Sequence, residues 1–164
     1  MVFKDFTFFS YVFLATAVIL LADPAHGAGL CDNSPNKDVC NSIVYQRTDP
    51  RDAVVAFIHK LVNQTRVGKV VAQRQAKSNE IVKCITEFDR SIEFAKGALN
   101  GLDKGDLATL KNYITAAQNN YVVCDEVFRA NGETNPIAKT TNFLEEIVGV
   151  GLYLIKLIKW RRAW

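Results

Sequence analysis

The sequence of 164 residues predicts an all-α protein, an up-down-up-down four-helix bundle preceded by a short N-terminal element. Apolar residues recur at steps of three and four along four long segments, which is the period of an amphipathic helix. No stretch shows sustained apolar–polar alternation, and Pro, Gly and capping residues bound each segment. Helices of about 20 to 28 residues with short connections favour antiparallel neighbours, so the four segments should form one bundle.

The first 28 residues are expected to be a secretory signal peptide. Lys4 supplies a positive charge near the start, and residues 6–22 are almost entirely apolar. Small residues follow, as signal peptidase prefers, at Ala25, Gly27 and Ala28. The apolar run is about long enough to span a bilayer, so a retained membrane anchor is the alternative, although no basic stop-transfer cluster follows it. We therefore expect cleavage near Gly27 or Ala28.

The remaining chain is long enough for one domain over 29–160, followed by a short tail over 161–164. Losing residues 1–28 would remove one Lys and two Asp and raise the formal charge from +3 to +4. This weak and scattered positive charge does not indicate nucleic acid as a partner. The basic and aromatic tail could touch a membrane surface or an acidic polymer, with a solvated helix end as the plainer interpretation.

The N-terminal element and the first long helix each begin at a capping residue followed by proline. Ser34-Pro35 predicts a helix that runs to about Gln46, and Asp49-Pro50 predicts a second that runs to about Lys77. The core positions of this second helix are expected to be Val54, Phe57, Ile58, Leu61, Val62, Val70 and Val71.

The middle of this long helix carries two further signals. Asn63-Gln64-Thr65 is a candidate N-glycosylation site at Asn63, which is usable only if it is exposed. Thr65 and Gly68 are weak helix formers, so we expect the second half of the helix to be weaker than the first.

The next two helices form the clearest pattern in the chain. The stretch from Asp103 to Asp106 (DKGD) breaks the first of them, and Asp106 can cap the second, which Asn131-Gly132 ends. The apolar stripe of the first comprises Ile81, Cys84, Ile85, Phe88, Ile92, Ala95, Leu99 and Leu102. The stripe of the second comprises Leu107, Leu110, Ile114, Ala117, Tyr121, Cys124 and Phe128.

Asn135-Pro136 opens the last helix. Its inner positions are expected to be Ile137, Phe143, Leu144, Ile147, Val148, Leu152, Ile155 and Ile158. Its apolar stretch raises the question of a membrane span, but the charged side chains of Glu145, Glu146, Lys156 and Lys159 argue against one. We therefore expect a buried bundle helix and no membrane span in the mature chain.

The four cysteines all follow the leader, and an even number in a small secreted chain indicates disulfides. Four cysteines allow three pairings. Cys84 lies 20 residues before Lys104 and Cys124 lies 20 residues after it. Residues equidistant from the turn of an antiparallel helix pair face each other, so these two cysteines can meet. Cys31 and Cys40 are then left to pair locally, since other pairings would require the N-terminal element to reach into the bundle twice.

The sequence offers little that could carry catalysis. His59 is the only histidine after residue 28, and no nucleophile elbow, phosphate-binding glycine loop or Cys-x-x-Cys motif is present. Zinc sites use more closely spaced cysteine pairs than Cys31 and Cys40. Glu145 and Glu146 are adjacent on a helix and point about 100° apart, which suits acid/base catalysis poorly. We therefore expect no enzyme, no cofactor and no metal site.

Four stretches together resemble the plant invertase inhibitor and pectin methylesterase inhibitor family. They are CDNSPNKDVC (31–40), CITEFDRSIEFAKGAL (84–99), YITAAQNNYVVCDEVF (113–128) and NPIAKTTNFLEEIVGVGLYLIKLI (135–158). The order and spacing of the cysteines within this helix pattern carry the resemblance, which covers nearly all of the chain after the leader. The residues from Leu99 to Ala117 are most similar to the pollen-allergen-like branch of invertase inhibitors.

The resemblance implies an N-terminal helical hairpin closed by one disulfide and a four-helix bundle closed by a second. It also implies a function: a secreted protein of the apoplast and cell wall, or of the vacuole, that sterically blocks an acid invertase or a pectin methylesterase. The expected partner is therefore the target enzyme, and the inhibitor itself is expected to be a monomer.

The resemblance also points to the residues that would contact the target. Invertase inhibitors of the family insert Pro-Lys-Phe, which follows a Lys-Gly-Asp sequence, into the enzyme. Pectin methylesterase inhibitors often carry Thr in a Ser-Ala-Ala-Leu-Thr-Asn segment, which corresponds to residues 115–120 here. The candidate contacts are accordingly Lys104, Gly105, Asp106, Leu107, Ala108, Thr109 and Asn119.

This chain departs from both motifs, and the departures keep other hypotheses open. Leu107-Ala108-Thr109 replaces Pro-Lys-Phe, and Asn119 replaces the Thr. The main alternative is a secreted helical module without inhibitory activity, such as a diverged allergen-like or ligand-binding protein. A detached pro-region is a third hypothesis, since pectin methylesterases carry a similar domain ahead of their catalytic part. Lys104-Gly105-Asp106 could also be a plain helix–helix turn.

Overall fold

The computed structural model describes residues 29–159, and within this range it contains five helices and no strands. The expected signal peptide over 1–28, the last residue of the expected domain and the tail over 161–164 lie outside the described residues. The helices are α2 (Lys37–Val44), α3 (Pro50–Gln73), α4 (Asn79–Asp103), α5 (Leu107–Ala130) and α6 (Ala138–Leu157).

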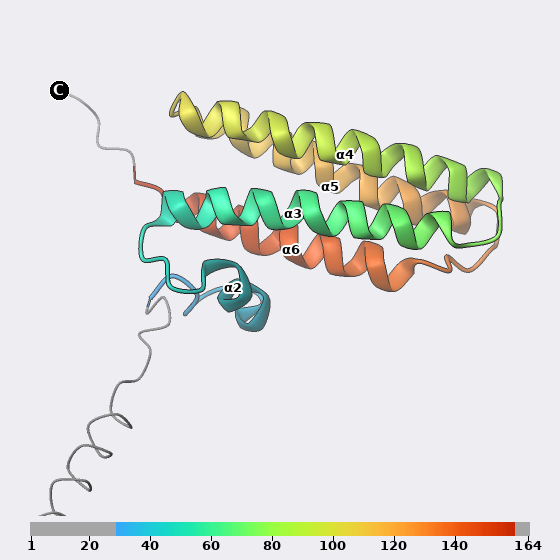
Figure 1. The fold of residues 1–164 in the computed structure, drawn as a ribbon, viewed down its shortest axis with the longest axis horizontal. Coiled ribbons are helices and arrows are strands. Elements are labelled where there is room, and N and C mark those ends of the chain that lie inside the picture. Colours follow the sequence, from blue (N-terminus) through green and yellow to red (C-terminus); the bar gives the residue numbers. More distant parts are fainter. Residues whose placement is uncertain (1–28, 160–164) are drawn as a thin grey trace, which may run out of the picture.

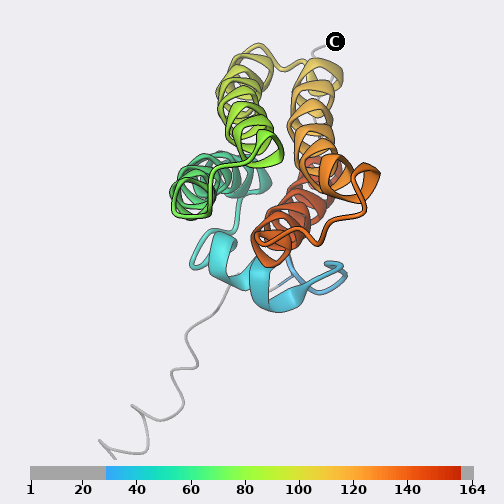
Figure 2. The ribbon, with the colours of Figure 1, turned by 90° about the vertical axis from the view of Figure 1, so that its right-hand side faces the viewer.

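Helices α3 to α6 form an up-down-up-down bundle, which confirms the predicted fold class (Figure 1). Viewed along the bundle, each of these helices occupies one corner and packs against the two helices next to it (Figure 2). Helix α3 is therefore diagonal to α5. The short helix α2 lies across the side of the bundle that α3 and α6 form, away from the α4–α5 pair.

Side-chain caps explain where α2, α3, α4 and α5 begin, whereas α6 begins at Ile137 without one. Asp49 Oδ1 accepts hydrogen bonds from the first turn of α3, and Ser78 Oγ accepts one from Ile81 N in α4. The predicted N-cap of α2 was wrong by two residues. Asn36, rather than Ser34, caps the helix, and its side chain accepts a hydrogen bond from Val39 N. Ser34 instead lies in a turn closed by the hydrogen bond from its amide to Cys31 O, and its hydroxyl donates to Asn36 O at 3.2 Å.

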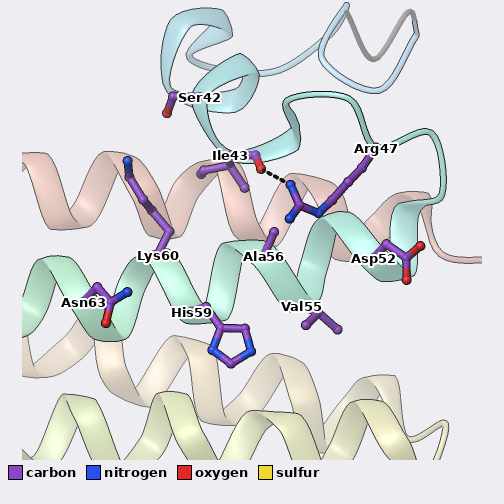
Figure 3. A pocket seen from close by; sticks show the side chains of 9 residues that line it. All are labelled: Ser42, Ile43, Arg47, Asp52, Val55, Ala56, His59, Lys60 and Asn63. Carbon is purple, nitrogen blue, oxygen red and sulfur yellow. Dashed lines mark hydrogen bonds between the residues drawn. The ribbon is translucent and has the colours of Figure 1, made fainter.

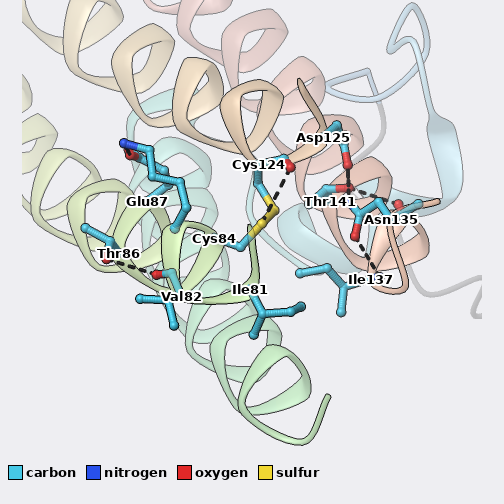
Figure 4. The surroundings of a disulfide bond; sticks show 12 residues. Ile81, Val82, Cys84, Thr86, Glu87, Cys124, Asp125, Asn135, Ile137 and Thr141 are labelled. Atoms are coloured by element: carbon cyan, nitrogen blue, oxygen red, sulfur yellow. Dashed lines mark hydrogen bonds and ion pairs between the residues drawn. A yellow bond between two sulfur atoms is a disulfide. The ribbon is translucent and has the colours of Figure 1, made fainter. Parts of the chain in front are cut away.

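Two disulfides join the cysteines in the predicted pairs. Cys31 and Cys40 are bridged with their Cα atoms 5.7 Å apart, and Cys84 and Cys124 are bridged with theirs 4.7 Å apart. The second bridge links α4 to α5 within the core (Figure 4). Closing loops of these lengths contributes about 3 and about 4 kcal/mol to stability in the chain-entropy model.

The core predictions hold along α4 and α5 but fail at two positions elsewhere. Val70 in α3 and Phe143 in α6 are 45% and 39% exposed. Thr65 and Gly68, which were expected to weaken α3, are buried on its inner face. A Cβ at Gly68 would lie 2.9 Å from Thr140 Cγ2, so a small residue there lets α3 and α6 approach closely.

Asp125, next to Cys124 in α5, ties this helix to the start of α6 beside the second disulfide (Figure 4). Asp125 Oδ1 accepts hydrogen bonds from Thr141 Oγ1, at 2.8 Å, and from Asn135 Nδ2. Asn135 Oδ1 in turn accepts from Ile137 N. These bonds satisfy polar groups at the helix junction and fix the entry of the chain into α6.

Candidate functional site

The turn between α4 and α5, which we call the α4–α5 tip, consists of Lys104, Gly105 and Asp106. Asp106 N donates to Gly101 O at 2.8 Å and Gly105 N donates to Leu102 O at 3.1 Å. Gly105 has φ = +72°, a conformation that glycine adopts without strain. This pair of bonds with a left-handed glycine is a Schellman motif, so the tip has one defined shape.

Asp106 also caps α5. Its Oδ1 accepts from Thr109 N at 2.9 Å, and its Oδ2 accepts from Thr109 Oγ1 at 2.6 Å. The Thr109 side chain, the Thr109 amide and, more weakly, the nearby Lys104 lower the pKa of this carboxyl. The same aspartate therefore ends the tip and starts the helix, as predicted from the sequence.

The six candidate residues from Lys104 to Thr109 differ in their environment. Lys104 and Ala108 are exposed and available to a partner, Gly105 is partly buried, and the exposed Asp106 carboxylate bonds to Thr109. Leu107 packs against the hydrophobic core, and the Thr109 hydroxyl bonds to Asp106. Leu107 and Thr109, two of the three residues at the position of the Pro-Lys-Phe motif, are therefore used by the fold itself.

The two helices meet closely just behind the tip. A Cβ at Gly101 would lie 2.7 Å from Leu110 N, so only glycine permits this approach of the backbones. Arg51 at the start of α3 lies 3.6 Å from Asp103 Oδ1 and joins the tip to the neighbouring helix. These contacts, with the Cys84–Cys124 bridge further along, present the tip on a rigid support.

Asn119 lies on the outer surface of α5, well away from the tip. It lies thirteen positions after Asp106, which corresponds to about 20 Å along the helix. It nevertheless shares one face with residues near the tip, because steps of three and four bring helical positions into line. We call this face the α5 outer stripe, and its members are Ala108, Asn112, Thr115, Asn119 and Glu126.

A shallow groove of about 350 Å³ runs beside this stripe, between α4 and α5. Tyr113, which is 36% exposed, and Phe94 face each other there with ring centroids 6.3 Å apart. The other lining residues are Thr109, Asn112 and Ala116. No motif in the sequence predicted this groove, although one signal was present: Phe94 and Tyr113 both fall outside the apolar stripes of their helices.

A second, more polar groove of about 480 Å³ separates α2 from α3 (Figure 3). His59, which is exposed, lies in this groove with Lys60, Asp52 and Arg47. Arg47 Nη1 donates to Ile43 O and to Val44 O, both at 3.3 Å, and so holds the end of α2. Asn63 lies exposed at the rim of the same groove.

The two adjacent carboxylates of α6, Glu145 and Glu146, lie in different environments. Glu146 Oε2 accepts a hydrogen bond from Asn36 Nδ2, which ties α6 to the N-terminal element. Partial burial raises the pKa of Glu145, and the nearby Asp125 carboxylate adds to the effect. Within residues 29–159, no three His, Cys, Asp or Glu side chains gather as they would around a metal ion.

No helix in the described part of the chain has both the length and the apolar character that crossing a bilayer requires.

No protein-family model and no curated protein matches the chain by sequence. Solved structures with a similar fold, in contrast, are found. A mutant form of a pectin methylesterase inhibitor from Arabidopsis matches with a TM-score of 0.66 and 14% identity, over 83% of this chain and 99% of that one.

A pectin methylesterase inhibitor from Arabidopsis thaliana also matches, with a TM-score of 0.59 and 14% identity. This match covers 80% of the present chain and 94% of the inhibitor. The protein is therefore a disulfide-linked helical bundle with the fold of pectin methylesterase inhibitors. At this identity the likeness defines the fold, and the fold agrees with the resemblance found in the sequence.

Proposed function

We propose that this protein is a secreted protein inhibitor of a plant carbohydrate enzyme and has no catalytic activity of its own. The observation that supports this most is the structural match to pectin methylesterase inhibitors over nearly their whole length. Two disulfides in a small domain are typical of oxidising compartments and support passage through the secretory pathway to the apoplast, the cell wall or the vacuole.

The proposed mechanism is steric. The α4–α5 tip and the α5 outer stripe would lie over the substrate cleft of the target, with Lys104, Ala108 and Asn119 as exposed contacts. A stable interface buries about 800 Å² on each partner and involves about 20 to 30 residues on each side, so α4 residues beside the groove would also contribute. The Schellman motif, the Asp106 cap and the disulfide hold this surface in one shape, so little conformational entropy is lost on binding.

Tyr113 is the proposed anchor within this surface. Aromatic side chains at the centre of an interface often supply much of the binding energy, and Tyr113 stands half-exposed at the groove beside Asn112. A loop of the target that carries an apolar side chain could fill the groove between Tyr113 and Phe94. This contact would add apolar burial to the polar contacts along the stripe.

We propose pectin methylesterase as the first target class to test and acid invertase as the second. The fold relatives named above are pectin methylesterase inhibitors. Leu107 packs into the core and Thr109 bonds to Asp106, so neither projects as a plug into an enzyme. A helix face acting as the blocking surface is therefore more consistent with this chain than an inserted tripeptide.

The alternative, a non-inhibitory secreted helical module, is favoured by the same observation about Leu107 and Thr109. If the tip serves only the fold, Lys104-Gly105-Asp106 is a plain helix–helix turn. The two functions differ in a simple way. An inhibitor binds a carbohydrate enzyme and lowers its activity, whereas a non-inhibitory module leaves the activity of both enzyme classes unchanged.

The experiment is a titration of purified pectin methylesterase and purified acid invertase with the oxidised protein. We expect one enzyme class to be inhibited at micromolar concentration or below. Asn119→Arg should weaken inhibition at least about tenfold, because it places a long charged side chain in the interface. The matched control, Asn142→Arg, changes an exposed residue of α6 outside the proposed surface and should inhibit like the unmodified protein.

A further inference from the structure

The sequon Asn63-Gln64-Thr65 lies in the middle of α3. The Asn63 side chain is exposed at the rim of the groove between α2 and α3 (Figure 3). An exposed amide in this sequence is the acceptor for an N-linked oligosaccharide. Asn63 therefore meets the requirement that the sequence alone left open, namely exposure of the acceptor.

Thr65, the third residue of the sequon, has the opposite environment. Its side chain is fully buried, and its hydroxyl donates to Leu61 O at 2.8 Å and lies 2.6 Å from the Tyr121 hydroxyl. Residues two apart on a helix point about 200° away from each other, so the amide and the hydroxyl cannot face one enzyme together. The acceptor sequence is recognised as Asn-x-Ser/Thr, which includes this hydroxyl. The folded bundle is therefore not a substrate for glycosylation.

We propose that Asn63 carries an N-linked glycan, and that the glycan is attached before α3 packs into the bundle. The inference rests on the secretion of the chain that is part of the proposed function. The donor is a polyprenyl diphosphate-linked oligosaccharide. A bond forms between the sugar C1 and Asn63 Nδ2, the bond from C1 to the diphosphate breaks, the amide loses a proton and the polyprenyl diphosphate leaves.

The folded protein has room for a glycan on Asn63, although the folded protein cannot itself accept one. Asn63 Nδ2 is at the surface, so a glycan there extends into solvent without disturbing the Thr65–Tyr121 contact. The glycan would overhang the groove that contains His59 and Lys60. Helix α3 is diagonal to α5 in the bundle, so the α5 outer stripe stays uncovered. The glycan thus leaves the proposed inhibitory surface free and shields the opposite side.

The first test is to direct the full chain into the secretory pathway of plant cells and to measure its mass before and after enzymatic removal of N-linked glycans. We expect a mass loss of one glycan, with the attachment at Asn63 located by peptide mapping. The variant Asn63→Gln should be secreted without the added mass, and Thr65→Ser, which preserves the sequon, should retain it. A secreted, unmodified chain would overturn the proposal.

The second test examines the order of events. The unglycosylated chain is offered to an oligosaccharyltransferase preparation with lipid-linked oligosaccharide, either folded with both disulfides or reduced and unfolded. We expect modification of the unfolded chain alone. Equal modification of the folded chain would overturn the inferred order. Both tests measure the mass of the chain, so they do not depend on whether the protein inhibits an enzyme. A failure of secretion is detected separately, because the protein would then be absent from the medium.

Discussion

The hydroxyl oxygens of Thr65 in α3 and Tyr121 in α5 lie 2.6 Å apart in the centre of the bundle. This contact crosses the diagonal of the four-helix arrangement, and both side chains are fully buried. In α4, Ser91 Oγ donates to Ala117 O of α5 at 3.0 Å. Polar contacts therefore connect three helices inside an otherwise apolar core, and they fix how the helices are aligned.

Removing the Tyr121 hydroxyl should lower the stability of the bundle. The variant Tyr121→Phe leaves Thr65 with Leu61 O as its remaining partner, so we expect the free energy of unfolding to fall by about 1 kcal/mol. Urea unfolding followed by circular dichroism measures this. Tyr113→Phe is the control, because Tyr113 is partly exposed, and it should change stability by less than about 0.5 kcal/mol. Equal effects of the two substitutions would contradict this account of the core.

Tyr121 should also make the protein sensitive to high pH. Burial raises its pKa to about 12, although the neighbouring hydroxyls of Thr65 and Ser91 partly offset the effect. Because the pKa in the folded state exceeds the unfolded value of about 10, the stabilisation is complete below pH 10 and is lost as the pH rises towards 12. The unfolding free energy should therefore fall more steeply over this range than in Tyr121→Phe. Parallel curves for the two proteins would contradict the prediction.

Two glycines of α6 give a matched pair of substitutions. A Cβ at Gly151 would overlap the buried Phe57 ring, whereas a Cβ at Gly149 would meet nothing within 4 Å. Gly151→Ala should therefore destabilise the protein by about 1 to 3 kcal/mol through overpacking. Gly149→Ala should stabilise it by up to about 1 kcal/mol, because alanine is the better helix former. Thermal unfolding compares the two, and a stabilised Gly151→Ala would show that α3 and α6 are not this close.

The cap at Asp106 should lose its effect in acid. Hydrogen bonds from Thr109 lower the pKa of this carboxyl, so its stabilisation is present above the ordinary Asp value of about 3.9 and is lost as the pH falls through the lowered pKa. The isosteric Asp106→Asn cannot titrate. At neutral pH the unmodified protein should have a larger free energy of unfolding than Asp106→Asn, and this difference should shrink in acid. Urea unfolding at steps between about pH 5 and about pH 2 follows this, and a difference that stays constant would refute it.

Much of the architecture could be predicted because apolar periodicity and capping are local properties of the sequence. The predicted caps Asp49 and Asp106 begin two of the helices, and the position of Lys104 midway between Cys84 and Cys124 led to the correct disulfide. The errors at Val70 and Phe143 have a three-dimensional cause. Gly68 faces Thr140 of α6, so Val70, two positions later and about 200° around the helix, points to solvent. In α6 the buried side is taken by Leu144, and the adjacent Phe143 is left exposed.

The candidate surface was only partly predictable. Lys104 and Asp106 could be recognised as a turn, and Asn119 by its place in a motif. The packing of Leu107 and the bond from Thr109 to Asp106 depend on how α5 sits against its neighbours, which no local pattern records. The groove at Tyr113 likewise needs Phe94, a residue 19 positions earlier on another helix.

The central claim is that the α4–α5 tip and the α5 outer stripe block a carbohydrate enzyme. The most direct measurement is the inhibition constant for pectin methylesterase, with acid invertase in parallel, for the unmodified protein, Asn119→Arg and Asn142→Arg. The account predicts inhibition of one enzyme class that Asn119→Arg weakens at least about tenfold, or about 1.4 kcal/mol, and that Asn142→Arg preserves. No inhibition of either enzyme, or equal inhibition by both variants, would contradict it.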